Sequence, residues 1–217
     1  MTAGTTALTT THEAVAGHAR EGGISNVILG MLLFITSEVM FFAGLFAAYF
    51  NVRATAPVWP PGDFADKLHW LPTAEQIIPI VTVATIMLVS SSFTCQLGVW
   101  GIRRDDRTAL IRGIAVTFVL GATFLLLQLY DYSILYSEGV RLDTGTFGTT
   151  YYTLTGFHFA HVLGGVIMLS VVLYRAMAGQ FSSRHHDMVE ATSIYWHFVD
   201  VVWIVLFSVI YVIPNPA

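Results

Sequence analysis

Five apolar stretches dominate this sequence, and each is long enough to cross a lipid bilayer as a helix. They cover residues 24–50, 75–100, 109–136, 151–175 and 191–213. A spanning helix needs about 20 mainly apolar residues, because it rises ~1.5 Å per residue through a hydrocarbon core ~30 Å thick. The stretches lack the polar–apolar alternation of membrane-barrel strands. The sequence therefore predicts an all-α integral membrane protein, built as a bundle of five transmembrane helices.

The remaining sequence predicts a single membrane domain, residues 24–217, preceded by a flexible N-terminal tail, residues 1–23. Of the 217 residues, 55% are hydrophobic and only 11% are charged, which lies outside the range of soluble globular domains. The tail lacks the apolar segment of a cleavable signal peptide, so the first helix is expected to direct insertion. The formal net charge of −4 gives no reason to expect nucleic acid binding.

The distribution of basic residues predicts the orientation. Seven arginines lie in or beside the tail and the second and fourth loops: Arg20, Arg103, Arg104, Arg107, Arg112, Arg175 and Arg184. The opposite side carries Arg53, Lys67 and Arg141. Cytoplasmic loops carry the excess of Lys and Arg, so the N-terminus is predicted to be cytoplasmic and the C-terminus outside. Tyr195 and Trp196 are expected in the aromatic belt of the inner interface.

Ionisable side chains inside the apolar stretches are the strongest functional signal. They are Glu38, Asp131, His158, His161, His197 and Asp200. Charged groups are costly inside a spanning helix, so they usually face the bundle interior and mark a function or a polar partner. We expect these six residues to form an intramembrane polar network.

The depth of each polar group can be counted from the outer end of its helix. Glu38, His161 and Asp200 are ~18, ~15 and ~20 Å deep, whereas Asp131 and His158 are only ~8 and ~10 Å deep. Equal depth predicts two contacts between helices. The first joins Glu38 to His161, with Asp200 able to join them, and the second joins Asp131 to His158.

Three interpretations of this network differ in chemistry. His158 and His161 share a helical face, as do His197 and Asp200, and such sets hold di-metal centres when Glu-x-x-His motifs accompany them. The sequence has no Glu-x-x-His, so no metal is predicted. A proton relay and simple hydrogen bonding between helices remain, and the second is favoured for this chain alone.

Other positions in the sequence indicate packing and surface contacts and are less specific for function. Ser90–Gln96 gives the second helix a small, weakly polar face, and Gly121, Gly164 and Gly165 likewise predict close helix packing. Apolar neighbours favour a neutral Glu38 carboxyl unless His161 holds it ionised. The second loop carries Arg103, Arg104 and Arg107, which are either solvated or in contact with anionic lipid head groups.

Four motifs occur in order along the chain. They are SExMFF from Ser37, QxYDY from Gln128, TGFHxxHV from Thr155 and YWHFVDVVW from Tyr195. Together they resemble subunit III of heme-copper terminal oxidases over the whole chain from residue 24 onward. The chain is similar to the short, five-helix bacterial form, and SSFTCQ from Ser91 most resembles cytochrome c oxidase subunit III of the actinobacterial type. Two departures from the long form are the absence of its two first helices and Asp131 in place of a glutamate.

The resemblance implies a non-catalytic accessory subunit of a proton-pumping cytochrome c oxidase of the aerobic respiratory chain. Such a subunit packs on subunit I beside subunit II, supports proton uptake and protects the oxygen-reducing site from turnover inactivation. It would bind no redox cofactor itself, with hemes and copper in the partner subunits. Glu38 would correspond to the carbodiimide-reactive carboxylate of the family and His161 to its partner.

The resemblance also implies a place in the cell and further partners. We expect a multi-pass protein of the bacterial cytoplasmic (inner) membrane. Its further expected partners are phospholipids and a larger respiratory supercomplex. The two missing helices form one wall of the family's lipid cleft, so lipid binding here would depend on a neighbouring subunit.

Alternatives within the family are subunit III of a quinol oxidase and the small homologue associated with nitric oxide reductase. A stand-alone proton transporter would use Glu38, His161 and Asp200 as its relay. It should show an internal repeat or a broken helix at the midplane, and neither is visible in the sequence. A membrane metalloenzyme would need more inward ligands than the chain offers.

Overall fold

The structure, a computed structural model, describes residues 24–56, 59 and 74–212. Within them five long helices follow one another: α1 (Asn26–Thr55), α3 (Ala74–Arg103), α4 (Arg107–Ser137), α5 (Thr146–Met177) and α6 (Asp187–Phe207). A short π-helix, η1 (Ser208–Val212), continues α6. All five long helices are apolar and long enough to cross a membrane. The predicted all-α bundle is confirmed, whereas the predicted tail 1–23 lies outside the described residues.

Several helices extend beyond the predicted apolar stretches. α1 continues to Thr55 and α5 begins at Thr146, each five residues beyond the predicted limit. The apolar count therefore marks the span of hydrophobic residues and not the helix ends, because helical structure continues through the more polar residues that follow. Side-chain caps mark two helix starts: Ser25 accepts from the Ile28 N–H at 3.4 Å and Asp106 accepts from the Ala109 N–H at 2.9 Å.

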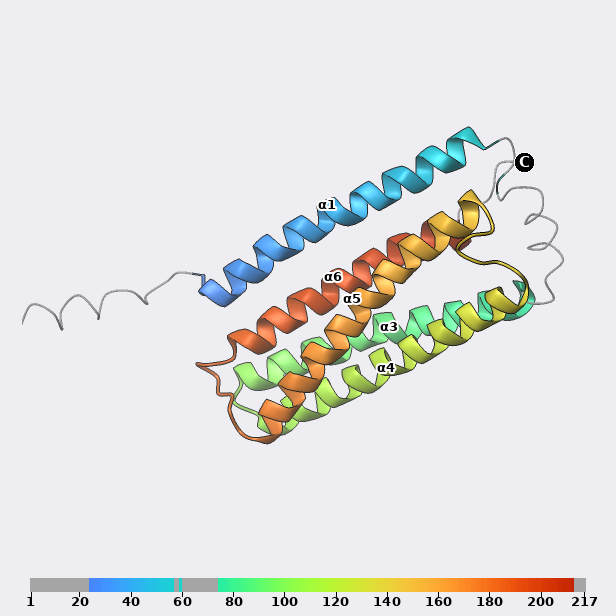
Figure 1. The fold of residues 1–217 in the computed structure, drawn as a ribbon. Coiled ribbons are helices and arrows are strands. Elements are labelled where there is room, and N and C mark those ends of the chain that lie inside the picture. Colours follow the sequence, from blue (N-terminus) through green and yellow to red (C-terminus); the bar gives the residue numbers. More distant parts are fainter. Residues whose placement is uncertain (1–23, 57–58, 60–73, 213–217) are drawn as a thin grey trace, which may run out of the picture.

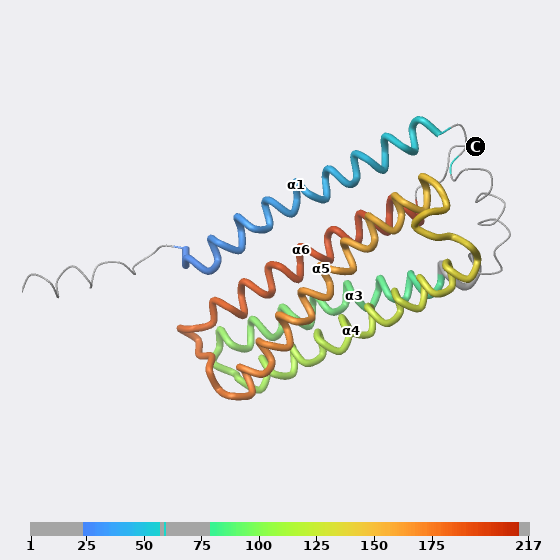
Figure 2. Tube along the Cα trace, in the orientation of Figure 1, coloured from blue at the N-terminus to red at the C-terminus, as the bar shows by residue number. Residues whose placement is uncertain are grey.

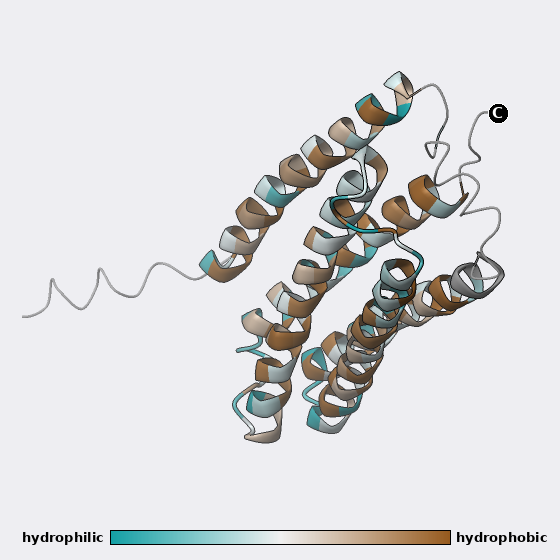
Figure 3. Ribbon diagram, turned by 45° about the vertical axis from the view of Figure 1, so that its right-hand side comes forward, coloured by the Kyte–Doolittle hydropathy of each residue, from teal (hydrophilic) through white to brown (hydrophobic). Residues whose placement is uncertain are grey.

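The helices form an up-and-down bundle in which α5 and α6 occupy the middle (Figure 1). α3 and α4 lie side by side on one flank, and α1 lies on the opposite flank, where it packs against α5 and α6. The tube in Figure 2 shows the same separation of α1 from α3 and α4. Hydrophobic residues cover the helix shafts, and hydrophilic residues gather at the ends and turns (Figure 3).

Glycines bring α3 and α4 into backbone contact. A Cβ added at Gly113 would lie 2.6 Å from the Gly98 backbone nitrogen, far closer than packed atoms allow. Beside this contact the hydroxyls of Thr94 and Thr117 hydrogen-bond at 2.8 Å. The close packing expected of the small-residue face on the second helix is therefore present.

Trp196 fills the centre of the bundle. The indole is fully buried and lies against Gly121 and Gly165, where an added Cβ would come within 2.5 Å and 2.7 Å of its ring atoms. Its Nε1–H donates to the Ser91 hydroxyl at 2.9 Å. The expectation that Trp196 lies in the interfacial belt is wrong, because the two glycines leave a space in the core that the ring occupies.

Candidate functional site

Glu38 on α1 and His161 on α5 form a polar pair between two helices. The Nε2 atom of His161 lies 2.9 Å from Oε2 of Glu38, as the depth count predicts. Both residues lie near the middle of their helices, Glu38 ~18 Å from the start of α1 and His161 ~22 Å from the start of α5. The pair is therefore far from both ends of the two helices.

A backbone carbonyl fixes the proton arrangement of this pair. Nδ1 of His161 lies 2.7 Å from the carbonyl oxygen of Phe157, which can only accept, so Nδ1 carries a proton. Nε2 then either accepts from a protonated Glu38 or, in the imidazolium, donates to a carboxylate. In both cases the Glu38–His161 hydrogen bond contains one proton that can lie on either residue. The arrangement can hold a proton inside the apolar layer.

Aromatic rings surround the pair without sealing it from outside. The ring of Phe42 meets the imidazole edge-on at 4.9 Å, and the exposed Phe41 packs on the same imidazole and on Phe157. The side chains of Glu38 and His161 keep 18% and 15% of their exposure. The pair is thus reachable from the membrane side of the bundle, past apolar groups.

A second polar group links α3 to α6. The Ser92 hydroxyl donates to Asp200 Oδ2 and accepts from Nδ1 of His197 at 3.0 Å. The other ring nitrogen of His197 lies 3.4 Å from Oε1 of Gln96. His197 and Asp200 therefore act together, as their shared helical face predicts.

The proposal that Asp200 joins Glu38 and His161 is wrong. Asp200 has the expected depth, but its face of α6 points to α3, whereas His161 contacts α1. Depth fixes the level of a side chain along the bundle, and only the packing of the helices fixes the direction in which it points.

The predicted contact between Asp131 and His158 is also wrong. The Asp131 carboxylate accepts from the hydroxyl of Tyr151 and from the amide of Gln128, each at 3.2 Å. Tyr151 in turn hydrogen-bonds Tyr211 at 2.8 Å. His158 instead has Nε2 3.2 Å from the carbonyl oxygen of Val199.

A misplaced helix start explains this error. Because α5 begins at Thr146, His158 is ~18 Å below that end, about 8 Å deeper than counted from residue 151. Tyr151 is two turns nearer the end on the same face of α5, and it takes the place that the depth count gave to His158.

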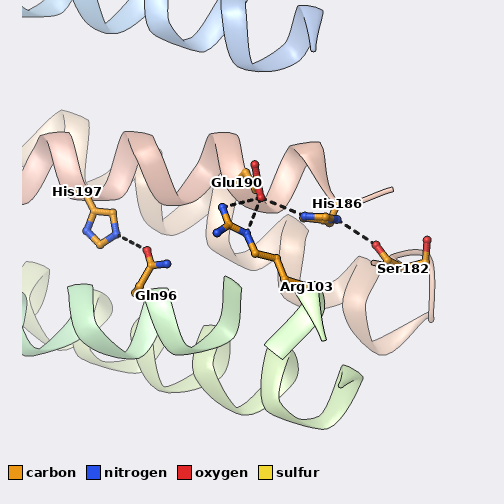
Figure 4. A network of polar contacts seen from close by, with 6 residues as sticks. All are labelled: Gln96, Arg103, Ser182, His186, Glu190 and His197. Carbon is orange, nitrogen blue, oxygen red and sulfur yellow. Dashed lines mark hydrogen bonds and ion pairs between the residues drawn. The ribbon is translucent and has the colours of Figure 1, made fainter. Parts of the chain in front are cut away.

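The predicted lipid-contacting arginines have different surroundings. Two nitrogens of Arg103 lie 2.9 Å from Oε1 of Glu190, and His186 Nε2 lies 3.1 Å from the same oxygen (Figure 4). Arg107 donates to the carbonyl oxygens of Ala176 and Met177 at the end of α5. Arg104 is exposed.

Comparison with known proteins identifies the chain. The family model for cytochrome c oxidase subunit III matches residues 8–214. The chain belongs to the cytochrome c oxidase subunit III family. It is 39% identical over 211 residues to a protein of Mycobacterium tuberculosis named "Probable cytochrome c oxidase subunit 3", covering 96% of this chain and 99% of the relative.

Other relatives carry the same subunit name. The cytochrome c oxidase subunit 3 of Corynebacterium diphtheriae is 41% identical over 86% of this chain and 88% of its own length. That of Synechocystis is 37% identical over 95% of this chain and 84% of its own length. The resemblance to the oxidase subunit III family, with actinobacterial relatives, is confirmed, and membership implies a part in an oxidase complex.

Among the described residues, no three His, Cys, Asp or Glu side chains gather as metal ligands. Three buried oxygens in the described part of the chain lack a hydrogen-bond partner: Asp131 Oδ1, Thr192 Oγ1 and Asp200 Oδ1. The two carboxylates each use one oxygen in a polar contact and leave the other unpaired.

Sequence reasoning missed two polar clusters in this subunit III. The first joins Asp131, Tyr151 and Tyr211, and nothing in the spacing of tyrosines signals it. The second joins Arg103, His186 and Glu190, and His186 is itself the residue before α6. The four-residue spacing from His186 to Glu190 was an available signal, because such pairs share a helical face.

Proposed function

We propose that this chain is the accessory subunit III of a proton-pumping cytochrome c oxidase in the aerobic respiratory chain. It carries no redox centre and packs on subunit I, in a complex with subunit II whose hemes and copper lie in the partners. It lies in the bacterial cytoplasmic membrane with its N-terminus inside. The observation that carries the proposal is the family match over residues 8–214, made by a chain with five spanning-length helices.

The Glu38–His161 pair supports a role in handling protons. One proton lies between two ionisable groups in the middle of the apolar layer, and the side chains keep partial exposure. Such a pair can exchange its proton with a neighbouring group without moving a helix. We propose that it supports proton uptake by the partner subunit and thereby protects the oxygen-reducing site during turnover.

The other intramembrane groups have a structural role in this proposal. Asp131, His158, His197 and Asp200 are held by hydrogen bonds within the bundle, and three of the four are almost fully buried. They join α3, α4, α5 and α6 into one unit. That unit positions α5, which carries His161.

The outward face of α1 supports packing against a partner. Large apolar side chains on it are exposed, among them Leu33, Val39 and Met40, and only Phe42 and Tyr49 among the described residues of α1 are buried. A helix so weakly enclosed and bearing a membrane-embedded acid fits a place at the junction with another subunit.

A pull-down tests the proposal directly. A tag on the N-terminus, mild detergent and a reduced-minus-oxidised spectrum should give heme absorbance in a fixed ratio to this chain, with oxygen consumption from reduced cytochrome c. Oxidation of quinol in place of cytochrome c would assign the chain to a quinol oxidase. A colourless chain that purifies alone, under conditions that keep membrane complexes intact, would refute the proposal.

A further inference from the structure

A groove of about 450 Å³ runs between α3 and α4 at the end where the two helices are joined. This volume lies within the range of about 300–1,000 Å³ found for ligand sites. The groove is remote from the Glu38–His161 pair, since α1 packs against α5 and α6 on the other flank of the bundle (Figure 1). Nothing in the proposed function uses it.

The floor and walls of the groove are apolar. Gly101 and Gly113, which let the α3 and α4 backbones touch, line its bottom, and a Cβ at either would collide with the opposite helix. Leu97, Trp100 and Val116 line it as well, and all three are about half exposed. The glycine contact therefore leaves a trough with an apolar, partly aromatic wall.

Two arginines line the same groove, Arg104 at the turn and Arg112 on α4. Both are exposed, and within the described residues neither has an ion pair or hydrogen bond, whereas Arg103 binds Glu190 and Arg107 binds carbonyl oxygens. Arg112 lies five residues after the start of α4, ~8 Å along the axis. Both arginines therefore lie at one end of the spanning helices, where such helices meet lipid head groups.

The acidic groups near the groove do not neutralise both arginines. Asp106 lines the groove, but its Oδ1 accepts the Ala109 N–H at the start of α4. Asp105 Oδ1 accepts the Ser183 N–H from the α5–α6 turn. Two guanidinium groups facing one capping carboxylate leave a net positive groove.

We propose that this groove binds an anionic phospholipid, with the phosphate between Arg104 and Arg112 and an acyl chain along Leu97, Trp100 and Val116. Guanidinium groups bind phosphate oxygens in pairs of hydrogen bonds. Tryptophan favours the interface between head groups and hydrocarbon. This proposal applies to either orientation of the chain in the membrane, and it does not depend on the proposed oxidase role.

Photo-crosslinking in the intact purified complex tests the site. The probes are phosphatidylglycerol and phosphatidylcholine with the same diazirine-bearing acyl chain, and the readout is the adduct yield on peptides within residues 94–116. The anionic probe should label these peptides more strongly than the zwitterionic one. In the double variant Arg104→Gln/Arg112→Gln, labelling by subsaturating phosphatidylglycerol should fall about 30-fold, since each basic residue contributes roughly fivefold to binding an anionic lipid.

Two further variants keep the test specific. Arg184→Gln removes an exposed arginine from another loop and should leave labelling unchanged. Val116→Trp fills the groove without changing charge and should reduce labelling by both probes. Equal labelling by the two probes, or an unchanged yield in the double variant, would overturn the proposal. So would adducts on these peptides that appear only after the complex is dissociated, because a partner protein would then cover the groove.

Discussion

Two regions of this chain use the same kinds of side chain in opposite surroundings. At the rim, Glu38 on α1 meets His161 on α5, and both side chains remain 15–18% exposed. In the core, Asp200 and His158 are 4% and 1% exposed, and their partners are a hydroxyl and a backbone carbonyl. An acid paired with a histidine at the rim can share a mobile proton, whereas the core groups are held in fixed hydrogen bonds.

The packing around the polar groups also differs between the two regions. The core is closed by glycine contacts in which not even a methyl group has space, as at Gly113, Gly121 and Gly165. On α1, a Cβ added at Gly30 or Gly44 would meet nothing within 4 Å. The tight packing of the core stabilises the bundle. The α1 side of the bundle, here called the rim, has space for contact with another molecule.

Gly113→Ala should cause the largest loss of stability. The added Cβ would lie 2.6 Å from the backbone nitrogen of Gly98, so α3 and α4 must move apart. We expect a loss of about 3 kcal/mol in the free energy of unfolding, measured by detergent-induced unfolding of the purified chain. Gly44→Ala, on open α1, is the matched control and should change stability by less than about 0.5 kcal/mol. Equal losses would remove the distinction between core and rim.

Asp200→Ala should destabilise the bundle by about 1 kcal/mol, the usual size of a hydrogen bond between membrane helices. The change leaves the Ser92 hydroxyl without its carboxylate acceptor, while that hydroxyl can still accept from Nδ1 of His197. Asp200→Asn retains an acceptor oxygen and should lose less than half as much in the same unfolding measurement. If the Asn variant were as unstable as the Ala variant, the hydrogen bond to Ser92 would not be the source of the stability.

Glu38→Ala should leave assembly intact and cost about 0.5 kcal/mol of stability, yet shorten the working life of the oxidase. The measurement is oxygen consumption during continuous turnover, compared with wild type at equal heme content. Glu38→Gln can still donate to Nε2 of His161 but cannot carry a negative charge, so it separates hydrogen bonding from proton exchange. A wild-type lifetime for Glu38→Ala would contradict the protective role.

His161→Ala should alter the chemistry of Glu38 most. Nε2 of His161 lies 2.9 Å from the Glu38 carboxyl, so removing the imidazole frees that carboxyl oxygen and opens space beside it for a hydrophobic carbodiimide. Labelling of Glu38 should therefore become faster, as followed by mass spectrometry of the α1 peptide. His158→Ala is the control, because His158 bonds Val199 and not Glu38. Similar rates in both variants would show that His161 does not govern Glu38.

Depth along a helix was accessible from the sequence because apolar stretches and a fixed rise per residue set it. That was sufficient for the Glu38–His161 contact, because α1 and α5 each extend five residues beyond their apolar stretch at the same end of the bundle, so the two depths shift together. It failed for Asp131, since α5 begins five residues earlier than its apolar stretch and every depth on it shifts. An error of five residues at a helix end, which is more than one turn, was enough to exchange one partner for another.

The five apolar helices, the family and the ionisable groups within the apolar stretches could all be predicted from the sequence. These follow from composition, length and local motifs, which do not depend on how the helices meet. Which ionisable group contacts which partner could not be predicted, because the direction in which a side chain points depends on how the helices pack. The glycines that admit Trp196 and bring α3 against α4 turn Asp200 toward Ser92, and the placement of α1 beside α5 leaves Glu38 and His161 at the rim.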